Sequence, residues 1–418
     1  MSGTGSVAVI GIGIVTALGQ GAAANWAAMR AGQSGAAPVQ RFPTEGLATR
    51  FAATVDAFCD PALRPTERTA ELALMAANEA LAQAGQEPGT AFPGKLVVGI
   101  PPIQMEWSDR IALDRATGGR ATGYGDLIRM VGAAKNSGLF DVLRFDGTTR
   151  RLAARVKPVG RPVTITTACS SGATAIQIGV EAIRRGEVDR VLAVGADASV
   201  SPEMLLRFGL LSALSRRNDS PETASRPFDK TRDGFVPGEG AGALVLERAE
   251  AAHARGANIL GYVRGVGERL DAYHRIRQRP DAGPVGAAMA AAIADAGLAP
   301  QDIGYVNAHG TSTGENDRVE SVGIGLVFGP RTPDLPVSSL KSMTGHMLSA
   351  AAAVEAAASL LMIAEQTLLP TINHETPDPE IPLDVVPNVA RPADVTHVLS
   401  NSFGFGGQNV CLVLSAEP

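Results

Sequence analysis

The stretch PVTITTACSSGATAIQIGVEAIRR, residues 162–185, predicts a strand, a tight elbow and a helix in direct succession. Residues 163–167 are rich in β-branched side chains, residues 168–172 are all small, and apolar residues then recur at helical spacing as far as Ile183. Cys169 is expected at the helix N-terminus, where unpaired N–H groups and peptide dipoles stabilise an anion and lower a thiol pKa. We therefore expect a reactive thiolate, since small neighbours leave the sulfur accessible; a buried cysteine acting as a small hydrophobe is the alternative.

A second stretch repeats this pattern in the other half of the chain. PVSSLKSMTGHMLSAAAAVEAAASLL, residues 336–361, again gives Pro-Val, a short strand, a small-residue elbow and an alanine-rich helix. Two such units predict a duplicated α/β architecture with facing elbows, in which His346 points toward Cys169. Chance similarity between two alanine-rich segments is the alternative.

Composition narrows the class of protein. The 418 residues are 45% hydrophobic, which supports a large core, and the net charge of −5 lacks the basic excess that nucleic-acid binding needs. Cys59, Cys169 and Cys411 are an odd set without paired spacing, so we expect no disulfide framework and a cytoplasmic protein. We see no signal peptide and no apolar stretch of membrane-spanning length; residues 348–364, interrupted by Glu355, predict a buried core helix.

Glycines near the N-terminus suggest a nucleotide site but do not fit one. An apolar strand at residues 7–10 runs into Gly11, Gly13 and Gly19. Thr16 stands where a dinucleotide fingerprint needs its third glycine, and no acidic residue ends a second strand at the right distance. We therefore expect no nucleotide cofactor.

Two of the six histidines lie where α/β proteins usually place their sites. His309 follows an apolar strand at residues 303–308 and begins HGTSTGEND, with Asp317 and Glu320 in or just beyond that run. His346 follows KSMTG and precedes the apolar helix. Such sites usually lie at the carboxyl ends of buried strands. The contexts of His253 and His397 indicate structural or exposed residues, and His374 lies in a proline-rich turn, TINHETPD.

Cys169, His309 and His346 together form a Cys-His-His set, with Lys341 five residues before His346 as a further cation. Each histidine alone is more often a satisfied structural residue, so the prediction depends on the set. A cysteine and two histidines can also bind zinc. Zinc is disfavoured because no C-x-x-C or H-x-x-x-H spacing is present, and we expect no metal.

Near the C-terminus, SNSFGFGGQNVCLVL places Gly404, Gly406 and Gly407 around Phe403 and Phe405 ahead of a terminal strand. Glycines at this density usually let the backbone come close to another group. The N–H groups of this segment could therefore supply an oxyanion site, an ordinary turn being the alternative.

Five motifs in order make the chain resemble the β-ketoacyl-acyl-carrier-protein synthases, the elongating condensing enzymes of the thiolase superfamily, most closely the synthase II branch. They are TACSSG (167–172), SRPFDKTRDGFVPGEGAG (225–242), NAHGTST (307–313), KSMTGH (341–346) and NSFGFGGQN (401–409). The resemblance implies the thiolase fold, a duplicated five-layer α/β/α/β/α arrangement, and a homodimer. We assign residues 1–253 to a first half with the nucleophile and residues 254–418 to a second half with the histidines.

The resemblance also implies the role of each polar residue. Cys169 would receive the acyl chain as a thioester, and His309 and His346 would donate N–H groups to the malonyl thioester carbonyl as carbon dioxide leaves. Lys341 and Glu320 resemble the supporting ion pair behind the histidines, with Asp317 a weaker candidate. The N–H groups of Cys169 and Phe405 match the oxyanion hole, and Phe405 resembles a gate. Four further residues are expected to bind substrate: Thr311, Thr313, Phe403 and Gly406.

A decarboxylating Claisen condensation suits these residues, because decarboxylation supplies the carbanion and no metal or redox cofactor is needed. Acyl transfer before condensation implies ping-pong kinetics. An acidic acyl-carrier protein would be the partner, with Arg64, Arg68, Arg207 and Arg217 as a basic docking patch. One rival is a non-catalytic chain-length partner subunit, which the retained Cys169 disfavours. The other is a thiolase, which needs a second reactive cysteine near the C-terminal glycines; Cys411 is expected within a strand and facing the core, so it does not fit that role.

The segment from 100 to 160 departs from the synthase II pattern. PPIQMEW (101–107) replaces the usual glycine-rich start, periodicity is weak, and Gln408 stands in place of a threonine. A long segment of this kind predicts an insertion, lid or interface. This variant resembles a sub-branch that handles very-long-chain acyl groups destined for lipid A.

Overall fold

The computed structural model describes residues 6–102 and 144–418 and, between them, Glu106, Trp107, Ile111, Arg115, Gly125, Arg129 and Gly132. Most of the predicted insertion at 100–160 lies outside the described residues. Its last part forms α6 (Gly147–Val156), which packs on α2 (Pro65–Gln83).

The first half of the chain forms a five-stranded arrangement. Its order is β6 (Val163–Ile165), β5 (Lys95–Gly99), β7 (Arg190–Asp197), β8 (Gly240–Arg248) and β1 (Val7–Thr16). Strands β6, β5 and β7 are parallel, whereas β8 and β1 run antiparallel to their neighbours. The parallel strands therefore end together beside the β6 elbow.

The second half repeats this arrangement. Its order is β11 (Pro336–Ser338), β10 (Tyr305–Asn307), β15 (His397–Phe403), β16 (Gln408–Ser415) and β9 (Gly261–Leu270), with β13 (Asp384–Val385) added outside β11. Again the first three strands are parallel and the last two antiparallel. Val7–Val9 of β1 pair with Gly261–Val263 of β9, which joins the halves into one sheet. The predicted duplication is confirmed by this matching topology.

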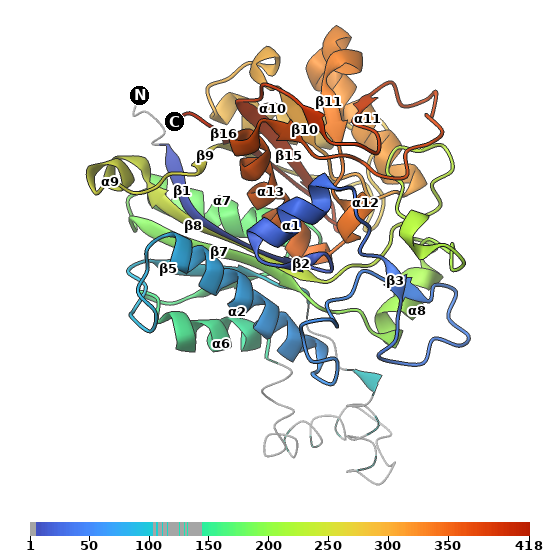
Figure 1. Cartoon of the computed structure of the whole chain (residues 1–418), viewed down its shortest axis with the longest axis horizontal. Helices are drawn as coiled ribbons and strands as arrows, with labels where there is room; N and C mark the ends of the chain where they lie inside the picture. Colours follow the sequence, from blue (N-terminus) through green and yellow to red (C-terminus); the bar gives the residue numbers. More distant parts are fainter. Residues whose placement is uncertain are drawn as a thin grey trace.

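Helices form three layers around the two half-sheets (Figure 1). Helices α7 (Ser171–Arg184) and α13 (Ala351–Glu365) lie between the half-sheets and contact each other. On the outer faces, α2 covers β1 and β8, while α10 (Gly283–Asp295) covers β9 and β16 with α11 (Gly314–Phe328) beside it. The predicted five-layer α/β/α/β/α order is confirmed.

The N-terminal glycines serve helix packing. A Cβ atom at Gly11 or Gly13 would collide with the carbonyl oxygens of Ala80 and Ala76 on α2. These glycines let α2 lie directly on β1, which accounts for a glycine pattern that resembles a nucleotide-binding loop.

Helix α13 is a core helix. By length and composition, residues Leu348–Glu365 could cross a membrane, contrary to our expectation that no stretch reaches that length. However, 78% of this stretch is buried inside the fold. Its apolar residues pack against β8 and β15, as the predicted core helix requires.

The remaining elements are short and mostly connect these layers. The helices are α1 (Ala22–Arg30), α8 (Pro202–Leu210), α9 (Ala249–Ala254) and α12 (Lys341–Thr344). The 3₁₀ turns are η1 (Pro221–Thr223), η2 (Pro300–Asp302), η3 (Gly329–Asp334) and η4 (Leu348–Ala350). The short strands are β2 (Gly19–Gln20), β3 (Ala37–Pro38), β4 (Phe51–Ala52), β12 (Thr367–Leu368) and β14 (Arg391–Pro392).

Candidate active site

The first elbow places Cys169 just before helix α7. The Ala168 backbone is left-handed, with φ of 51°, which turns the chain sharply after β6. The Ser171 hydroxyl accepts a hydrogen bond from Thr167 N (2.9 Å) and donates one to Ala168 O (2.6 Å). Cys169 is thereby held at the helix N-terminus, where only 6% of it is exposed.

The second elbow and the loop after β10 place the two histidines. His346 follows Gly345, whose φ is 66°, and its own N–H donates to Val236 O at 2.7 Å. Both oxygens of Glu320 accept backbone N–H groups at 2.8 Å, one from His309 and the other from Gly310. Backbone hydrogen bonds therefore fix the main chain at each imidazole.

The cysteine and both histidines line one cavity of about 360 Å³. The two imidazole rings are 5.3 Å apart between centroids and almost perpendicular, at 84°. The four expected substrate residues, Thr311, Thr313, Phe403 and Gly406, line the same cavity, and so does Phe405, the predicted gate. The prediction that the two halves bring a sulfur and two imidazoles into one chamber is confirmed.

The thiol of Cys169 differs from our expectation of a resting thiolate. Burial raises its pKa to about 11, although the N–H of Phe405, the Lys341 charge and the N–H of Cys169 itself lower it. Burial disfavours the charged form more strongly than the helix N-terminus favours it. Cys169 is therefore a neutral thiol in the free protein.

The two imidazoles are neutral as well. Burial lowers the pKa of both His309 and His346 well below the usual value, and the nearby Lys341 ammonium lowers each further. A neutral imidazole carries one N–H and can donate a hydrogen bond without giving up a charge. Both rings are therefore suited to stabilise a developing oxyanion.

The expected ion pair between Lys341 and Glu320 is wrong. The Lys341 ammonium bonds Glu355 Oε1 on α13 at 2.5 Å, and both side chains are 1% exposed. Glu320 instead accepts the N–H groups described above and one from the Asn401 amide at 3.0 Å. Burial raises the Glu320 pKa to about 7, against these hydrogen bonds. Glu320 thus holds the segment that carries His309, whereas Glu355 pairs with Lys341 in the segment that carries His346.

The glycine-rich segment before β16 comes close to the first elbow, as predicted. A Cβ atom at Gly404 would lie 2.6 Å from Thr167 O. The adjoining Phe405 directs its N–H to the Cys169 sulfur, and its ring lies 6.2 Å from that of Phe208. Phe405 lines the cavity and is 38% exposed, so it lies at the solvent-accessible part of the cavity wall.

The alternative readings of the site find no support. Within the described residues, no group of three His, Cys, Asp or Glu side chains could hold a metal ion. Cys411 is fully buried in β16 and does not line the cavity, so it cannot act as the second thiol of a thiolase. Cys169, the residue that a non-catalytic subunit would lack, is at the cavity.

Sequence reasoning missed two buried acids beside the site. Asp197, at the end of β7, accepts hydrogen bonds from Ser199 and from Ser349 N, and burial raises its pKa to about 6. The carboxyl-edge rule that selected His309 also selects this residue. Glu355 was visible as one acid within an apolar helix, a position that requires a buried partner.

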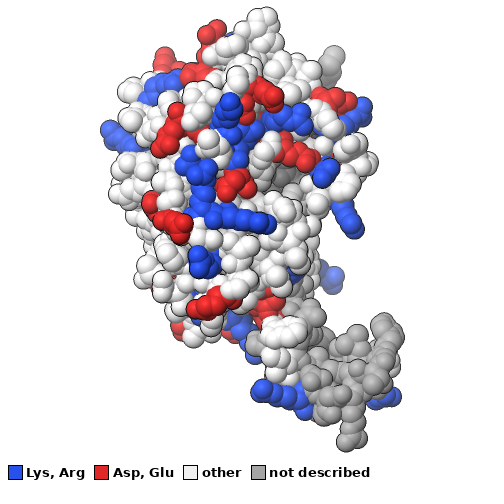
Figure 2. Space-filling model, turned by 90° about the vertical axis from the view of Figure 1, so that its right-hand side faces the viewer, with Lys and Arg blue, Asp and Glu red and all other residues white. Residues whose placement is uncertain are grey.

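Part of the predicted docking patch is also wrong. Arg68 is 3% exposed, and its guanidinium bonds the carbonyl oxygens of Leu63 and Pro61, near buried Glu239. Arg217 is half-buried and donates to Thr231 O at 2.7 Å, so its place in the patch stays a prediction. Arg64 and Arg207 are exposed. Figure 2 shows positive side chains gathered in the middle of one face, interleaved with negative ones.

A duplicated fold that brings an elbow cysteine and two histidines into one cavity defines a condensing enzyme of the thiolase fold. The chain belongs to the β-ketoacyl synthase family: residues 4–252 match the "Beta-ketoacyl synthase, N-terminal domain" and residues 260–375 the "Beta-ketoacyl synthase, C-terminal domain". It is 38% identical to the 3-oxoacyl-[acyl-carrier-protein] synthase 2 of Coxiella burnetii, over 98% of each chain. It is 37% identical to the tetracenomycin polyketide synthase ketoacyl synthase alpha subunit of Streptomyces glaucescens, over 98% of this chain and 96% of that one.

Solved structures agree over the full chain. A ketosynthase in complex with its type II polyketide acyl-carrier protein superposes with a TM-score of 0.88 at 32% identity, covering 99% of this chain and 100% of that one. A β-ketoacyl synthase from Burkholderia phymatum gives 0.84 at 34% identity, with the same coverage.

Proposed function

We propose that the protein condenses an acyl thioester with malonyl-acyl-carrier protein, with loss of carbon dioxide, to give β-ketoacyl-acyl-carrier protein in fatty-acid elongation. The observation that carries this proposal is one cavity lined by a buried, neutral thiol and two buried, neutral imidazoles. Four of the relatives named 3-oxoacyl-[acyl-carrier-protein] synthase 2 are 36–38% identical over nearly the full length.

In the first half-reaction, Cys169 takes the acyl group from its carrier. The sulfur attacks the thioester carbonyl, and the N–H groups of Cys169 and Phe405 stabilise the oxyanion that forms. The carrier thiol leaves with the proton that Cys169 gives up, so one thioester replaces another. Because this step precedes entry of malonyl-carrier, the reaction is ping-pong.

In the second half-reaction, His309 and His346 donate N–H groups to the malonyl thioester carbonyl. The carbon–carbon bond to the carboxylate breaks and carbon dioxide leaves. The electron pair of that bond stays on the malonyl carbon and forms an enolate with the thioester carbonyl. The enolate attacks the acyl-Cys169 carbonyl, and the same two backbone N–H groups stabilise the oxyanion. The Cys169 thiolate then leaves and takes up one proton from water. Since both imidazoles are neutral, neither needs to lose a proton to act.

The finer parts of the proposal concern partners and substrate. The partner is an acidic acyl-carrier protein that docks on exposed basic residues, among them Arg64 and Arg207, and the enzyme is a cytoplasmic homodimer with halves 1–253 and 254–418. Thr311, Thr313, Phe403 and Gly406 contact the substrate. The acyl chain is very long and destined for lipid A, a proposal supported only by the residues at 101–107 and Gln408.

The experiment that tests this function uses malonyl-carrier protein and a ladder of acyl-carrier proteins from short to very long chains. Mass spectrometry of the intact protein should find one acyl group on Cys169, and the product should be the β-ketoacyl-carrier lengthened by two carbons. Absence of both would overturn the proposed function. A preference for short chains would overturn the chain-length proposal alone.

A further inference from the structure

The motif SRPFDKTRDGFVPGEGAG contains a segment to which the mechanism above assigns no role. We call residues 225–239 the bracing segment. It contacts the second elbow at three points: Ser225 Oγ donates to Lys341 O at 2.7 Å, His346 N donates to Val236 O at 2.7 Å, and Gly238 N donates to His346 O at 2.9 Å. The backbone of His346 is thus hydrogen-bonded to this segment on both sides.

The same segment contacts the loop that follows His309. Arg226 N donates to Ser312 Oγ at 3.0 Å, and Phe228 N donates to Asp317 Oδ2 at 2.8 Å. Gly234 N donates to Ser312 O at 3.1 Å. The bracing segment therefore lies between the two histidine loops and is hydrogen-bonded to each.

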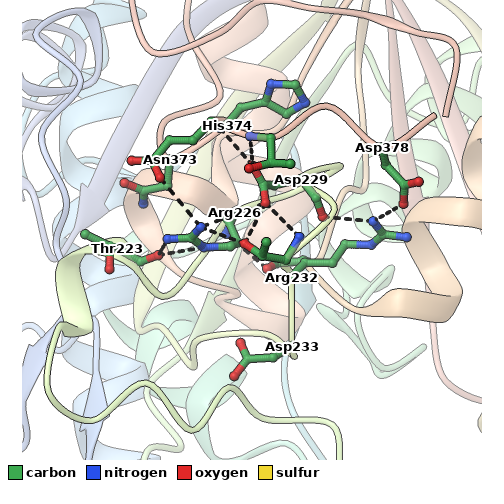
Figure 3. A network of polar contacts seen from close by, with 12 residues as sticks. Thr223, Arg226, Asp229, Arg232, Asp233, Asn373, His374 and Asp378 are labelled. Carbon is green, nitrogen blue, oxygen red and sulfur yellow. Dashed lines mark hydrogen bonds and ion pairs between the residues drawn. The ribbon is translucent and has the colours of Figure 1, made fainter. Parts of the chain in front are cut away.

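One side chain of the segment connects three parts of the chain. Arg232, 7% exposed, donates to Asp229 O (2.8 Å) within the segment and to the Asp378 carboxylate (2.7 Å) on a distant loop. It also approaches Thr313 O and Gly314 O, both at 3.4 Å. Figure 3 shows its guanidinium between Asp229 and Asp378.

Asp229 fixes the distant loop from the other side. It is fully buried and accepts N–H groups from Glu375 (2.8 Å) and Thr376 (2.6 Å), as well as the N–H and hydroxyl of Thr231. These bonds hold residues 375–376, and with them Asp378, beside the bracing segment, and Figure 3 shows Asp378 next to the Arg232 guanidinium. Arg232 therefore reaches a carboxylate whose position is already set.

The loop that Arg232 supports is part of the cavity. Thr311 and Thr313 line the cavity and share a hydrogen bond of 2.9 Å between their hydroxyls. This loop continues directly from His309, and only three residues separate Thr313 from that histidine. In contrast, no hydrogen bond or ion pair that joins the bracing segment to residues 166–172 is present in these two fully described segments.

We infer that Arg232 is a positioning residue that, through the bracing segment, holds the His309 loop at a fixed place relative to His346 without acting on the Cys169 elbow. The inference rests on the proposed function, in which the histidines serve decarboxylation and Cys169 serves acyl transfer. A misplacement of about 1 Å can cost on the order of 10²-fold in rate. Loss of Arg232 should therefore slow one half-reaction and spare the other.

The test measures the two half-reactions separately in Arg232→Lys. Lysine keeps the charge and can still reach Asp378, but it lacks the planar fork that also reaches the Thr313 and Gly314 carbonyls. Carbon dioxide release from malonyl-carrier protein should fall by about 10- to 100-fold. Formation of acyl-Cys169, followed by mass spectrometry, should stay within about twofold of the wild-type rate.

Arg391→Lys is the matched control, because Arg391 makes a two-pronged ion pair with Asp384 and does not line the cavity. It should change neither rate. As a readout independent of activity, amide hydrogen exchange should rise at residues 310–314 in Arg232→Lys and stay unchanged at 166–172. If Arg232→Lys does not fold, Asp378→Asn is measured in the same way, since it removes only the far anchor.

Equal losses in both half-reactions, or no loss in either, would overturn the positioning role. So would unchanged exchange at residues 310–314. Failure of the wild-type protein to release carbon dioxide would instead overturn the proposed function, and the exchange measurement would still decide whether Arg232 holds the loop.

Discussion

The two elbows share one plan and carry different chemistry. In the first, Cys169 is followed at once by α7, whereas in the second, α12 and η4 stand between β11 and α13. The longer second elbow makes room for Lys341, whose ammonium reaches back to Glu355 on α13. Duplication supplied a symmetric frame, and the difference in elbow length lets one half hold a nucleophile and the other a buried cation beneath a histidine.

Burial shifts the pKa values of the reactive groups at the two elbows in opposite directions and leaves both groups neutral. It raises the thiol pKa of Cys169 to about 11 and lowers the imidazole pKa of His346 well below the usual value. A resting thiolate–imidazolium pair, as in cysteine proteases, is therefore disfavoured here. The first elbow should serve acyl transfer and the second decarboxylation, and each can be removed without the other.

The largest expected effect comes from removing the thiol at the first elbow. Cys169→Ala should lower condensation by on the order of 10⁴-fold or more, because no acyl-enzyme can form. The protein should stay folded, since alanine fits the space of a small buried side chain. Product formation is measured by mass spectrometry, with circular dichroism as the control for folding.

If the two half-reactions are separable, Cys169→Ala should still release carbon dioxide from malonyl-carrier protein. Full condensing activity in this variant would remove Cys169 as the nucleophile. Loss of decarboxylation without loss of fold would show that the elbows act as one unit.

The reverse experiment removes the two imidazoles that the second half of the chain contributes to the cavity. His309→Ala and His346→Ala should each lower malonyl decarboxylation by about 10²–10³-fold, the usual cost of one oxyanion donor. Both variants should still acquire an acyl group on Cys169. The release of carbon dioxide is followed directly, and an unchanged rate in either variant would exclude that histidine from the role.

The sequence predicted the elbows and their reactive residues because strand, turn and helix patterns are local. The partner of Lys341 could not be predicted in this way. Glu320 and Glu355 lie 21 and 14 residues away, and only the packing of α13 between the sheets decides which carboxylate the ammonium meets. The thiol pKa was missed for a similar reason, since helix position is local whereas burial depends on the whole fold.

A smaller effect should follow from replacing the buried pair beneath the second elbow. Lys341→Met combined with Glu355→Leu leaves no buried charge unpaired, so the fold should survive. Without the ammonium, the imidazole pKa values rise toward their usual range, although burial still lowers them. The acid limb of the decarboxylation rate should therefore move to higher pH.

The pH profile measures this change. Wild-type decarboxylation should be flat from about pH 6 to 8, because both imidazoles stay neutral there. As the pH falls further, the double variant should begin to lose rate at a higher pH than the wild type. Arg391→Lys, which leaves the buried Lys341–Glu355 pair intact, serves as the control and should stay flat. Identical profiles in wild type and double variant would contradict a direct effect of Lys341 on the histidines.

The smallest effect concerns the charge behind the first elbow. The carboxylate of Asp197 raises the thiol pKa of Cys169, and Asp197 itself has a pKa raised by burial to about 6. Above pH 6 this carboxylate is charged, so Asp197→Asn should increase the thiolate fraction and speed alkylation by iodoacetamide about two- to fivefold near pH 9. Below pH 6 the wild-type group is already neutral and the difference should vanish.

Ser199→Ala is the matched control, since it removes a hydrogen bond to Asp197 without removing the charge, and its alkylation rate near pH 9 should equal that of the wild type. A structural effect of Asp197→Asn would change the rate equally on both sides of pH 6. Only an electrostatic effect disappears as the wild-type carboxylate gains its proton. A rate difference that vanishes below about pH 6 therefore shows that Asp197 acts on Cys169 through its charge and not through the structure of the first elbow.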